Sequence, residues 1–584
     1  MHRPNSVMMG GSECACEDGV YGMGQLELKI NVEVDDEAFF QCRVSVRNPT
    51  KQTQILSNVS VVLPRIEGRV LEHGWQSWSV VRRTAPDDVR PERQATELWR
   101  KRCLLAAPEF AGKAVVGEPF LLHEGGLIGV LDGAVNFGTV AVDPQRTIVE
   151  LLVGGTAVAP GAELVLDPLW IKSGDPTRVV EEFADAWGKQ NAARNRTRSP
   201  LGWCSWYQYF TAVKPTDIEA NQRACRQLGV EVIQIDDGYQ RAVGDWLDPA
   251  PGWGGKLADL ASSIRADGFV AGIWTAPFLA SEHSRVVAEH PEWVLREEDG
   301  RPLRAMYNPG SWGGWAVGLD PRNDDFIDHL QNTYRHLVEL GFTYHKIDFC
   351  YAGALGGVGT PMTGAQALRR GIGAIREAIG ADAFLLGCGC PFGAAIGLVD
   401  AMRVSADTAP RWSVPEIWAE DPKERGFVEH FPSARNSVEA SVLRTPLHRR
   451  LWINDPDCLM LRSFDTQLSE VERQLLGAVI AGTGGLVILS DDTTRYGGSE
   501  LELLDLVKTV ARENDACLEL AEPFAESPIV RARATELYVN WEQGGEMREL
   551  PPGDVLLPSS SVRPRVSQGA SPWAYLLRKE LSEL

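Results

Sequence analysis

Hydrophobic and polar residues alternate along the first third of the chain, in short runs separated by Gly, Pro and Asn-Pro turns. The runs cover residues 26–34, 40–46, 57–63, 127–130 and 164–171. Alternation with a period of two residues is typical of strands that bury one face. Residues 22–175 are therefore predicted to form an N-terminal β-sandwich. Residues 1–21 lack the apolar stretch of a signal peptide and are expected to be a disordered tail.

The pattern changes after a helix at 177–190, which we assign with a polar, Arg-rich linker to residues 176–200. From residue 201 short apolar strands alternate with helical segments, several of which begin with capping boxes: Thr216 with Glu219, Thr363 with Gln366, and Ser469 with Glu472. The strand candidates are 202–206, 232–236, 270–275, 344–348, 384–387, 401–404, 451–454 and 486–489. Eight strands over roughly 300 residues predict a central (β/α)8 TIM barrel, residues 201–513, whereas six or seven would allow an open sheet.

The last segment, residues 514–584, returns to strand-like runs at 529–534, 536–541 and 574–577, separated by Gly-Gly and Pro-Pro turns. This pattern predicts a small C-terminal antiparallel β-domain. The expected fold class is thus multidomain, with a sandwich, a barrel and a small β-domain in that order.

Composition narrows the choice of partners. A net charge of −21 over 584 residues disfavours nucleic acid and anionic membranes, because both would repel the surface, and no apolar run is long enough to span a bilayer. The 18 Trp residues suit the stacking of sugar rings as well as core packing. The 11 Cys show neither a disulfide framework nor zinc-finger spacing. We therefore expect a cytoplasmic protein without a metal or cofactor, and a homo-oligomer stays open.

In a barrel of this kind the active site lies at the carboxyl ends of the strands. Carboxylates follow at least five of the eight predicted strands: Asp236 and Asp237, Asp348, Asp407, Asp455 and Asp457, and Asp491 and Asp492. Asp also favours turns, which is sufficient to explain Asp491 and Asp492. Asp348 differs, because it lies in an apolar, aromatic run, where a carboxylate is costly to bury unless it is paired or functional. Lys346 lies on the same strand face and is expected to hold Asp348 ionised.

Asp407 lies two predicted strands after Asp348 and is preceded by Arg403. Two carboxylates in different environments are what glycoside hydrolysis requires: one attacks while the other protonates the leaving oxygen, at a separation of about 5–5.5 Å in retaining enzymes. Asp236 and Asp237, followed by Gly238, suit the binding of two sugar hydroxyls, although an Asp-Gly turn that caps a helix gives the same pattern.

Seven segments together resemble glycoside hydrolase family 36, of the same clan as the family 27 α-galactosidases. They are HGWQSWS (73–79), GWCSWYQYF (202–210), QIDDGY (234–239), GIWTAPF (272–278), HKIDFCYAGA (345–354), LLGCGCP (385–391) and MRVSADTAP (402–410). Many members have Trp between the Lys and the nucleophile, where this chain has Ile347. This departure and the short length indicate the compact bacterial type.

The resemblance implies a role for each matching residue. Asp348 would be the nucleophile and Asp407 the acid/base, while Asp236 and Asp237 would bind the C4 and C6 hydroxyls of galactose. Lys346 and Arg403 would hold ring hydroxyls. The remaining expected site residues line the sugar: Trp274, Trp206, Tyr207, Cys388 and Gly389 (near the C2 hydroxyl), and Trp75 or Trp78, one of which would reach the pocket from the sandwich.

The predicted function is that of a retaining exo-α-galactosidase that removes terminal α-linked galactose from small oligosaccharides of the melibiose or raffinose kind by double displacement. An α-N-acetylgalactosaminidase and an α-galactosyl transglycosylase are alternatives on the same scaffold. A carbohydrate-binding or sensory protein would not need both Asp348 and Asp407. A metal-dependent hydrolase would need His at strand ends, and the predicted strands have none there.

Overall fold

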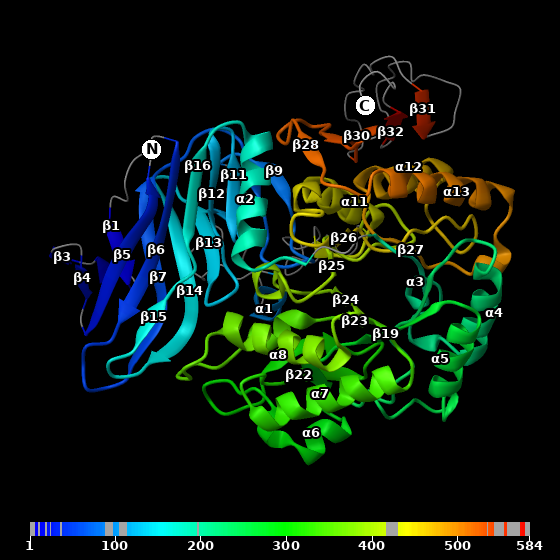
Figure 1. Ribbon diagram of the computed structural model, residues 1–584, viewed down its shortest axis with the longest axis horizontal. Coiled ribbons are helices and arrows are strands. Elements are labelled where there is room, and N and C mark those ends of the chain that lie inside the picture. Colours follow the sequence, from blue (N-terminus) through cyan, green and yellow to red (C-terminus); the bar gives the residue numbers. More distant parts are fainter. Residues whose placement is uncertain are drawn as a thin grey trace.

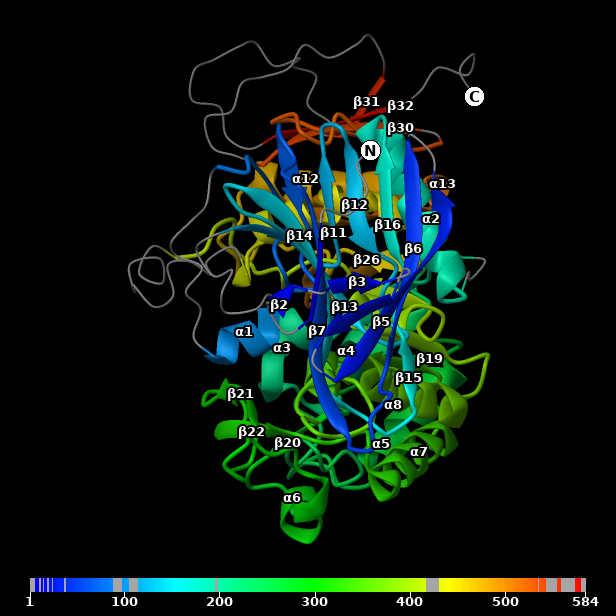
Figure 2. The same cartoon turned by 90° about the vertical axis from the view of Figure 1, so that its left-hand side faces the viewer.

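The protein has the three predicted parts in the predicted order (Figure 1). The computed structural model describes residues 6–9, 12–13, 15–17, 20–23, 25–35, 38–87, 97–103, 114–194, 198–415, 430–533, 535–541, 554–557 and 573–578. The β-rich N-terminal part lies beside the barrel, and the C-terminal sheet lies against helices on one side of the barrel (Figures 1 and 2).

The N-terminal part is a sandwich of two antiparallel sheets that enclose a core of Val, Leu and Ile side chains. The first sheet contains β10 (Val115–Gly117), β13 (Phe137–Val142), β14 (Arg146–Val158), β7 (Gln54–Pro64), β1 (Ser6–Met9) and β2 (Ser12–Glu13). The second contains β3 (Ala15–Glu17), β4 (Val20–Met23), β5 (Leu26–Asp35), β6 (Phe39–Arg47), β16 (Leu169–Ser173), β12 (Gly126–Val130), β11 (Phe120–His123), β8 (Val70–Glu72) and β9 (Arg82–Thr84), with β15 (Glu163–Val165) also paired to β6.

The structure differs from the expected tail at the N-terminus. Strand β1 pairs with β7 in antiparallel register, and β4 pairs with β5. The exposed edges of β7 and β5 each offer backbone groups to another strand, and such edges recruit neighbouring chain whatever its composition. The described residues between 6 and 21 therefore belong to the sandwich, while the other residues of that expected tail lie outside the described part.

Two helices lie where the sandwich meets the barrel. Helix α2 (Pro176–Gln190) begins with Asp175 as its N-cap and Pro at its first position, a common arrangement for a helix start. It buries Phe183 against Phe120 and Trp170 of the sandwich. The short helix α1 (Glu97–Cys103) comes from the N-terminal part and packs near strand β21 (Arg304–Asn308).

The central domain is an eight-stranded parallel barrel. Its strands are β17 (Leu201–Cys204), β18 (Val232–Ile235), β19 (Val270–Thr275), β23 (Tyr344–Ile347), β24 (Phe384–Gly387), β25 (Ala401–Arg403), β26 (Ile453–Asp455) and β27 (Val487–Leu489). Between β26 and β27 the amide of Leu486 donates to the carbonyl of Asn454 over 2.9 Å, which nearly closes the ring. Parallel strands covered on both faces are apolar along their whole length, and this explains the short continuous runs in the sequence.

The barrel helices are α3 (Trp206–Tyr209), α4 (Pro215–Cys225), α5 (Lys256–Ala266), α6 (Arg285–Glu289), α7 (Asp324–Glu339), α8 (Gly364–Ile379), α9 (Phe392–Ala395), α11 (Ala434–Leu443), α12 (Glu470–Thr483) and α13 (Gly498–Glu513). The capping boxes at Thr363 and Ser469 are confirmed. The box predicted at Thr216 is wrong: α4 begins at Pro215, and Asp217 accepts from the amide of Lys214 over 2.9 Å. Proline at the first helical position fixes the start two residues earlier than an N-cap at Thr216 would.

After β19 the chain forms an extra three-stranded sheet of β20 (Leu279–Ser281), β22 (Gly314–Gly318) and β21 before α7. The C-terminal sheet contains β28 (Glu519–Ala521), β29 (Ile529–Arg531), β30 (Thr535–Asn540), β32 (Trp573–Arg578) and β31 (Asp554–Leu557), all antiparallel, as predicted. Among the described residues no helix is both long and apolar enough to cross a membrane.

Candidate active site

The carboxyl ends of the barrel strands bring the predicted charged residues together. Asp236 and Asp237 follow β18, Asp348 follows β23, and Arg403 ends β25 with Asp407 four residues later. Lys346 of β23 pairs with Asp236 after β18, and Trp274 of β19 donates to Asp348 after β23, so strands far apart in sequence are connected here. Their arrangement was expected from the barrel alone, but their individual partners were not.

Asp348 sits at the point where β23 turns away from the barrel. The indole nitrogen of Trp274 donates to its Oδ2 over 3.1 Å, and the amide of Phe349 donates to its Oδ1 over 2.8 Å. Phe349 has a left-handed φ of 52°, an uncommon conformation for a bulky residue. The side chain of Asp348 is thus fixed by two N–H donors that stabilise its negative charge.

Lys346 forms its ion pair with Asp236 and not, as expected, with Asp348. Its ammonium donates to Oδ2 of Asp236 over 3.0 Å, and both side chains are buried. Burial alone would lower the pKa of Lys346, but the Asp236 carboxylate holds it well above its usual value, with a smaller contribution from Asp348. The Lys346 side chain starts on β23 and passes β19 to reach the end of β18. The strand period predicts the face on which Lys346 lies but not how far its side chain extends.

Asp237 receives two hydrogen bonds through its side chain. Gln240 donates to Oδ1 over 2.5 Å, and the indole nitrogen of Trp312 donates to Oδ2 over 2.9 Å. Burial raises the pKa of Asp237 to about 6; the two donors lower it, while the charges of Asp236 and Asp348 raise it. Each carboxylate oxygen keeps a lone pair free to accept from a ligand hydroxyl.

Trp312 was missed by the sequence analysis. It lies in the turn between β21 and β22, and its ring also packs on Phe349 with centroids 5.0 Å apart. The available signal was a Trp flanked by Gly310, Gly313 and Gly314 in a long insertion after the third barrel strand. Long insertions in a compact domain are commonly functional loops.

Arg403 is surrounded by three carboxylates. It donates to Asp407 over 2.9 Å and to Asp455 over 3.2 Å, and its Nη2 lies 2.6 Å from Oδ1 of Asp457. Tyr207 donates its hydroxyl hydrogen to Asp457, which also accepts from the amide of Thr408. Asp455 and Asp457 were predicted only as strand-end carboxylates; in the structure they anchor Arg403.

Asp407 differs from Asp348 in its environment. Asp407 is partly buried after the end of β25, whereas Asp348 is buried. Burial raises the pKa of Asp407 to about 6. The charges of Arg403 and Lys346 lower this pKa, whereas those of Asp457 and Asp348 raise it. One carboxyl group of the pair is therefore available to hold a proton near neutral pH.

The segment His73–Ser79 reaches the barrel through Trp78. The Trp78 ring packs edge-on against Phe349 at 4.8 Å, whereas Trp75 packs against Phe137 in the sandwich at 5.4 Å. The fully buried Arg444 fixes this segment, because its guanidinium donates to the carbonyls of Ser77 and Ser79 over 2.8 and 3.0 Å. Trp78, and not Trp75, is thus the indole of this segment that packs on Phe349, the residue after Asp348.

The other expected residues lie around the same end of the barrel. Cys388 is fully buried and Gly389, with a φ of 52°, lies directly under Trp78. Trp206 is partly buried and packs against Phe210. No group of His, Cys, Asp or Glu in the described part of the chain is arranged to hold a metal ion.

A family model described as Melibiase matches residues 189–350, which include Asp236, Asp237 and Asp348. The α-galactosidase AgaA of Geobacillus stearothermophilus is 28% identical over 169 residues, 27% of this chain and 22% of that protein. The chain is a relative of the family 36 α-galactosidases. The match to AgaA spans about a fifth of that protein's length.

Solved structures extend the likeness to most of the chain. The structure of TtGalA, an α-galactosidase from Thermus thermophilus in complex with stachyose, is 27% identical with a TM-score of 0.66, covering 86% of this chain and 99% of that one. The crystal structure of the family 36 enzyme AgaA has a TM-score of 0.62 at 14% identity, covering 98% of this chain and 86% of that one, and supports the fold. These findings confirm the expected fold, and the chain is similar to α-galactosidases in sequence as well as in structure.

Proposed function

We propose that the protein is a retaining exo-α-galactosidase that acts on small α-galactosides by double displacement. The observation that supports this most directly is the contrast between Asp348 and Asp407 at one barrel end. Asp348 accepts hydrogen bonds from two N–H donors, while burial raises the pKa of Asp407 to about 6. An anionic nucleophile and a protonated acid are the two roles that the reaction requires.

In the first step the Asp348 carboxylate attacks the anomeric carbon, and Asp407 transfers its proton to the glycosidic oxygen. The bond from the anomeric carbon to that oxygen breaks, and the aglycone leaves as an alcohol. In the second step Asp407, now ionised, takes a proton from water. The resulting hydroxide attacks the β-galactosyl intermediate and releases Asp348, which restores the starting protonation states.

Galactose recognition would fall to Asp236 and Asp237. Lys346 and Gln234 hold Oδ2 of Asp236 at 3.0 and 2.6 Å, and Trp312 and Gln240 hold Asp237, so both carboxylates are oriented before substrate arrives. Such preorganisation favours hydroxyls in one stereochemistry over another, because a misplaced hydroxyl leaves a buried acceptor unpaired.

Packing beside Cys388 and Gly389 favours a C2 hydroxyl over an acetamide. A Cβ atom built on Gly389 would lie 2.8 Å from Cη2 of Trp78, so the indole already fills the space above this segment. An α-N-acetylgalactosaminidase would need that volume for its larger substituent.

Two measurements test the proposal. A panel of p-nitrophenyl glycosides should show turnover of the α-galactoside and at least about 100-fold less of the α-glucoside, β-galactoside and α-N-acetylgalactosaminide. Asp348→Gly should be inactive and regain cleavage with azide, with β-galactosyl azide as the product. Preference for another glycoside would refute the specificity, and azide rescue of Asp407→Gly to the same β product would reverse the two roles.

A further inference from the structure

Arg444 is a fully buried cation at the end of α11, and in the described part of the chain no carboxylate pairs with it. Its guanidinium instead donates to the carbonyls of Ser77 and Val404 over 2.8 Å each, and of Ser79 over 3.0 Å. Burial lowers the pKa of Arg444 to about 9, so the side chain is still charged at neutral pH. A buried charge without a counter-ion is costly, and an apolar side chain would fill this space without that cost. Packing alone therefore does not explain an arginine here.

The Arg444 guanidinium ends a line of polar groups that starts in the sandwich. Its Nε lies 3.3 Å from Nε2 of His73, and Nδ1 of His73 lies 3.2 Å from the carbonyl of Glu118. Burial, with a smaller contribution from the charge of Arg444, holds the pKa of His73 well below its usual value. The neutral ring therefore donates to Glu118 and accepts from Arg444. It also stacks on Phe120 of β11, with centroids 4.4 Å apart, so the sandwich fixes one side of the guanidinium.

The segment that Arg444 holds packs on the residue after the proposed nucleophile. Trp78 lies between the two serines whose carbonyls accept from Arg444, and its ring centroid is 4.8 Å from that of Phe349. The amide of Phe349 donates to Oδ1 of Asp348 over 2.8 Å. Because Phe349 has a left-handed φ of 52°, its conformation depends on the contacts around it. The position of the Asp348 carboxylate thus depends on the path of the Trp78 segment.

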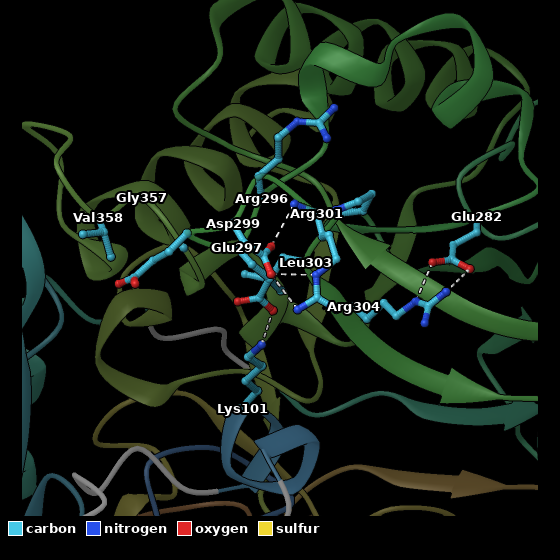
Figure 3. Close-up of a pocket in the computed structure, with 13 residues that line it drawn as sticks. Lys101, Glu282, Arg296, Glu297, Asp299, Arg301, Leu303, Arg304, Gly357 and Val358 are labelled. Atoms are coloured by element: carbon cyan, nitrogen blue, oxygen red, sulfur yellow. Dashed lines mark hydrogen bonds and ion pairs between the residues drawn. The ribbon is translucent and has the colours of Figure 1, made fainter.

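The same segment also holds helix α1 over the Trp78 ring. Ser79 donates its hydroxyl hydrogen to the last carbonyl of α1 over 2.6 Å. One residue before that carbonyl, Arg102 places its guanidinium 4.5 Å from the centroid of the Trp78 ring. Lys101 forms an ion pair of 2.6 Å with Glu297 in the wall of a cavity of about 1110 Å³, which fixes the far side of the helix (Figure 3). The indole is therefore enclosed by groups whose placement follows from this segment.

Arg444 reaches the strand of the proposed acid/base as well. Val404, which accepts from it, directly follows Arg403, and Asp407 lies three residues later. The amide of Val404 donates to the carbonyl of Asp455 over 2.9 Å, so both backbone groups of this residue are held. One guanidinium thus connects the Trp78 segment to the end of β25.

We propose that Arg444 is a positioning residue, which fixes the Trp78 segment against Phe349 and so sets the Asp348 carboxylate for attack on the anomeric carbon. Its side chain is fully buried, so it acts through Trp78 and not by contact with the sugar. A planar guanidinium that serves several carbonyls of one loop specifies the path of that loop. A displacement of about 1 Å at a reacting group lowers a rate by about 100-fold. The inference rests on the proposed function, because it concerns the same reaction.

Arg444→Lys tests this role, since it keeps the charge but loses the planar fork. The kcat/KM for a dinitrophenyl α-galactoside reports the attack of Asp348, because this leaving group needs little protonation. We expect it to fall about 10- to 100-fold per folded molecule, with the folded fraction taken from circular dichroism. The inhibition constant of galactose should change less than about threefold, because Asp236 and Asp237 keep their own partners.

Arg376→Lys is the matched control. Arg376 is also buried, and it donates to the carbonyl of Ala383 over 2.8 Å and to Asp400 over 2.6 Å. These two residues directly precede β24 and β25, at the end of the barrel away from the site. The control should lower the melting temperature but leave kcat/KM per folded molecule within about twofold of the wild type.

A milder variant and a double variant complete the test. His73→Phe keeps a ring on Phe120 but removes the acceptor of Arg444, and should lower the same kcat/KM about 3- to 10-fold. In a Trp78→Ala background, Arg444→Lys should lower kcat/KM by less than about twofold further, because the two residues act on Asp348 in series.

Kinetics of Arg444→Lys like those of Arg376→Lys would overturn the inference, and so would a galactose inhibition constant that rises as steeply as kcat/KM falls. Full, independent losses in the double variant would show that Arg444 does not act through Trp78. If Arg444→Lys does not fold, an unchanged kcat/KM in His73→Phe refutes the role. Absence of α-galactoside cleavage by the wild type would instead refute the proposed function, and the inference with it.

Discussion

The ammonium of Lys346 lies 3.0 Å from Oδ2 of Asp236, so the lysine that precedes the proposed nucleophile by two residues is paired with a carboxylate from another strand. Both groups are buried, at 5% and 2% exposure. The pair links the proposed catalytic strand β23 to the proposed galactose-binding end of β18 and makes the position of each depend on the other.

Loss of Lys346 should destabilise the protein as well as inactivate it. Lys346→Met leaves the Asp236 carboxylate buried without its cation, and we expect the free energy of unfolding to fall by about 3–5 kcal/mol. The double variant with Asp236→Asn should recover part of that loss, since the uncompensated charge is gone. Urea denaturation of the four proteins gives the coupling energy; additive effects would show that the ion pair is energetically unimportant.

The pH dependence of kcat/KM should show the ionisation of Asp407. Because its pKa is raised to about 6, the protonated acid is depleted above that pH, and kcat/KM for raffinose should fall about tenfold per pH unit on the alkaline side. In Asp407→Asn this limb should disappear when a dinitrophenyl α-galactoside, which needs little protonation, is the substrate. A limb that persists in the variant would belong to another group, such as Asp237, whose pKa is also raised to about 6.

Trp312→Phe removes the N–H that Asp237 accepts but keeps a ring to pack on Phe349. We expect KM for methyl α-galactoside to rise about 5- to 50-fold, the effect of losing one hydrogen bond to a charged acceptor. Trp293→Phe is the matched control, because in the described part of the chain the Trp293 indole nitrogen has no hydrogen-bond partner. An unchanged KM for galactosides in Trp312→Phe would separate Trp312 from sugar recognition.

Gly389→Ala should destabilise the protein by more than the positive φ of residue 389 alone explains. The new methyl group would lie 2.8 Å from Cη2 of Trp78 and 3.0 Å from the amide nitrogen of Phe349, the donor to Asp348. Gly154→Ala has a comparable φ of 69° but open space around the methyl, and should lose only about 1 kcal/mol of stability. We expect at least about 1 kcal/mol more loss for Gly389→Ala, together with at least tenfold lower kcat. Similar melting temperatures and activities of the two variants would contradict this packing.

Much of the fold followed from patterning alone. The eight barrel strands were predicted within a few residues, because strands buried on both faces are uninterrupted apolar runs. The capping box at Thr216 was wrong because Pro215, one residue earlier, takes the first helical position. The strands β1 to β4 were missed because edge pairing depends on a free neighbouring strand more than on local composition.

The sequence by itself determined which carboxylates stand at strand ends, since a chain that alternates strands and helices must place those ends at one face of the barrel. The sequence did not determine which side chains contact one another. Only the tertiary structure decided which side chains are in contact: Lys346 with Asp236, Arg403 with Asp455 and Asp457, Trp312 with Asp237, and Trp78 rather than Trp75 with Phe349. The strand period specifies the face on which a side chain lies, whereas its partner depends on the reach of that side chain across a closed barrel and on inserted segments that pack over it.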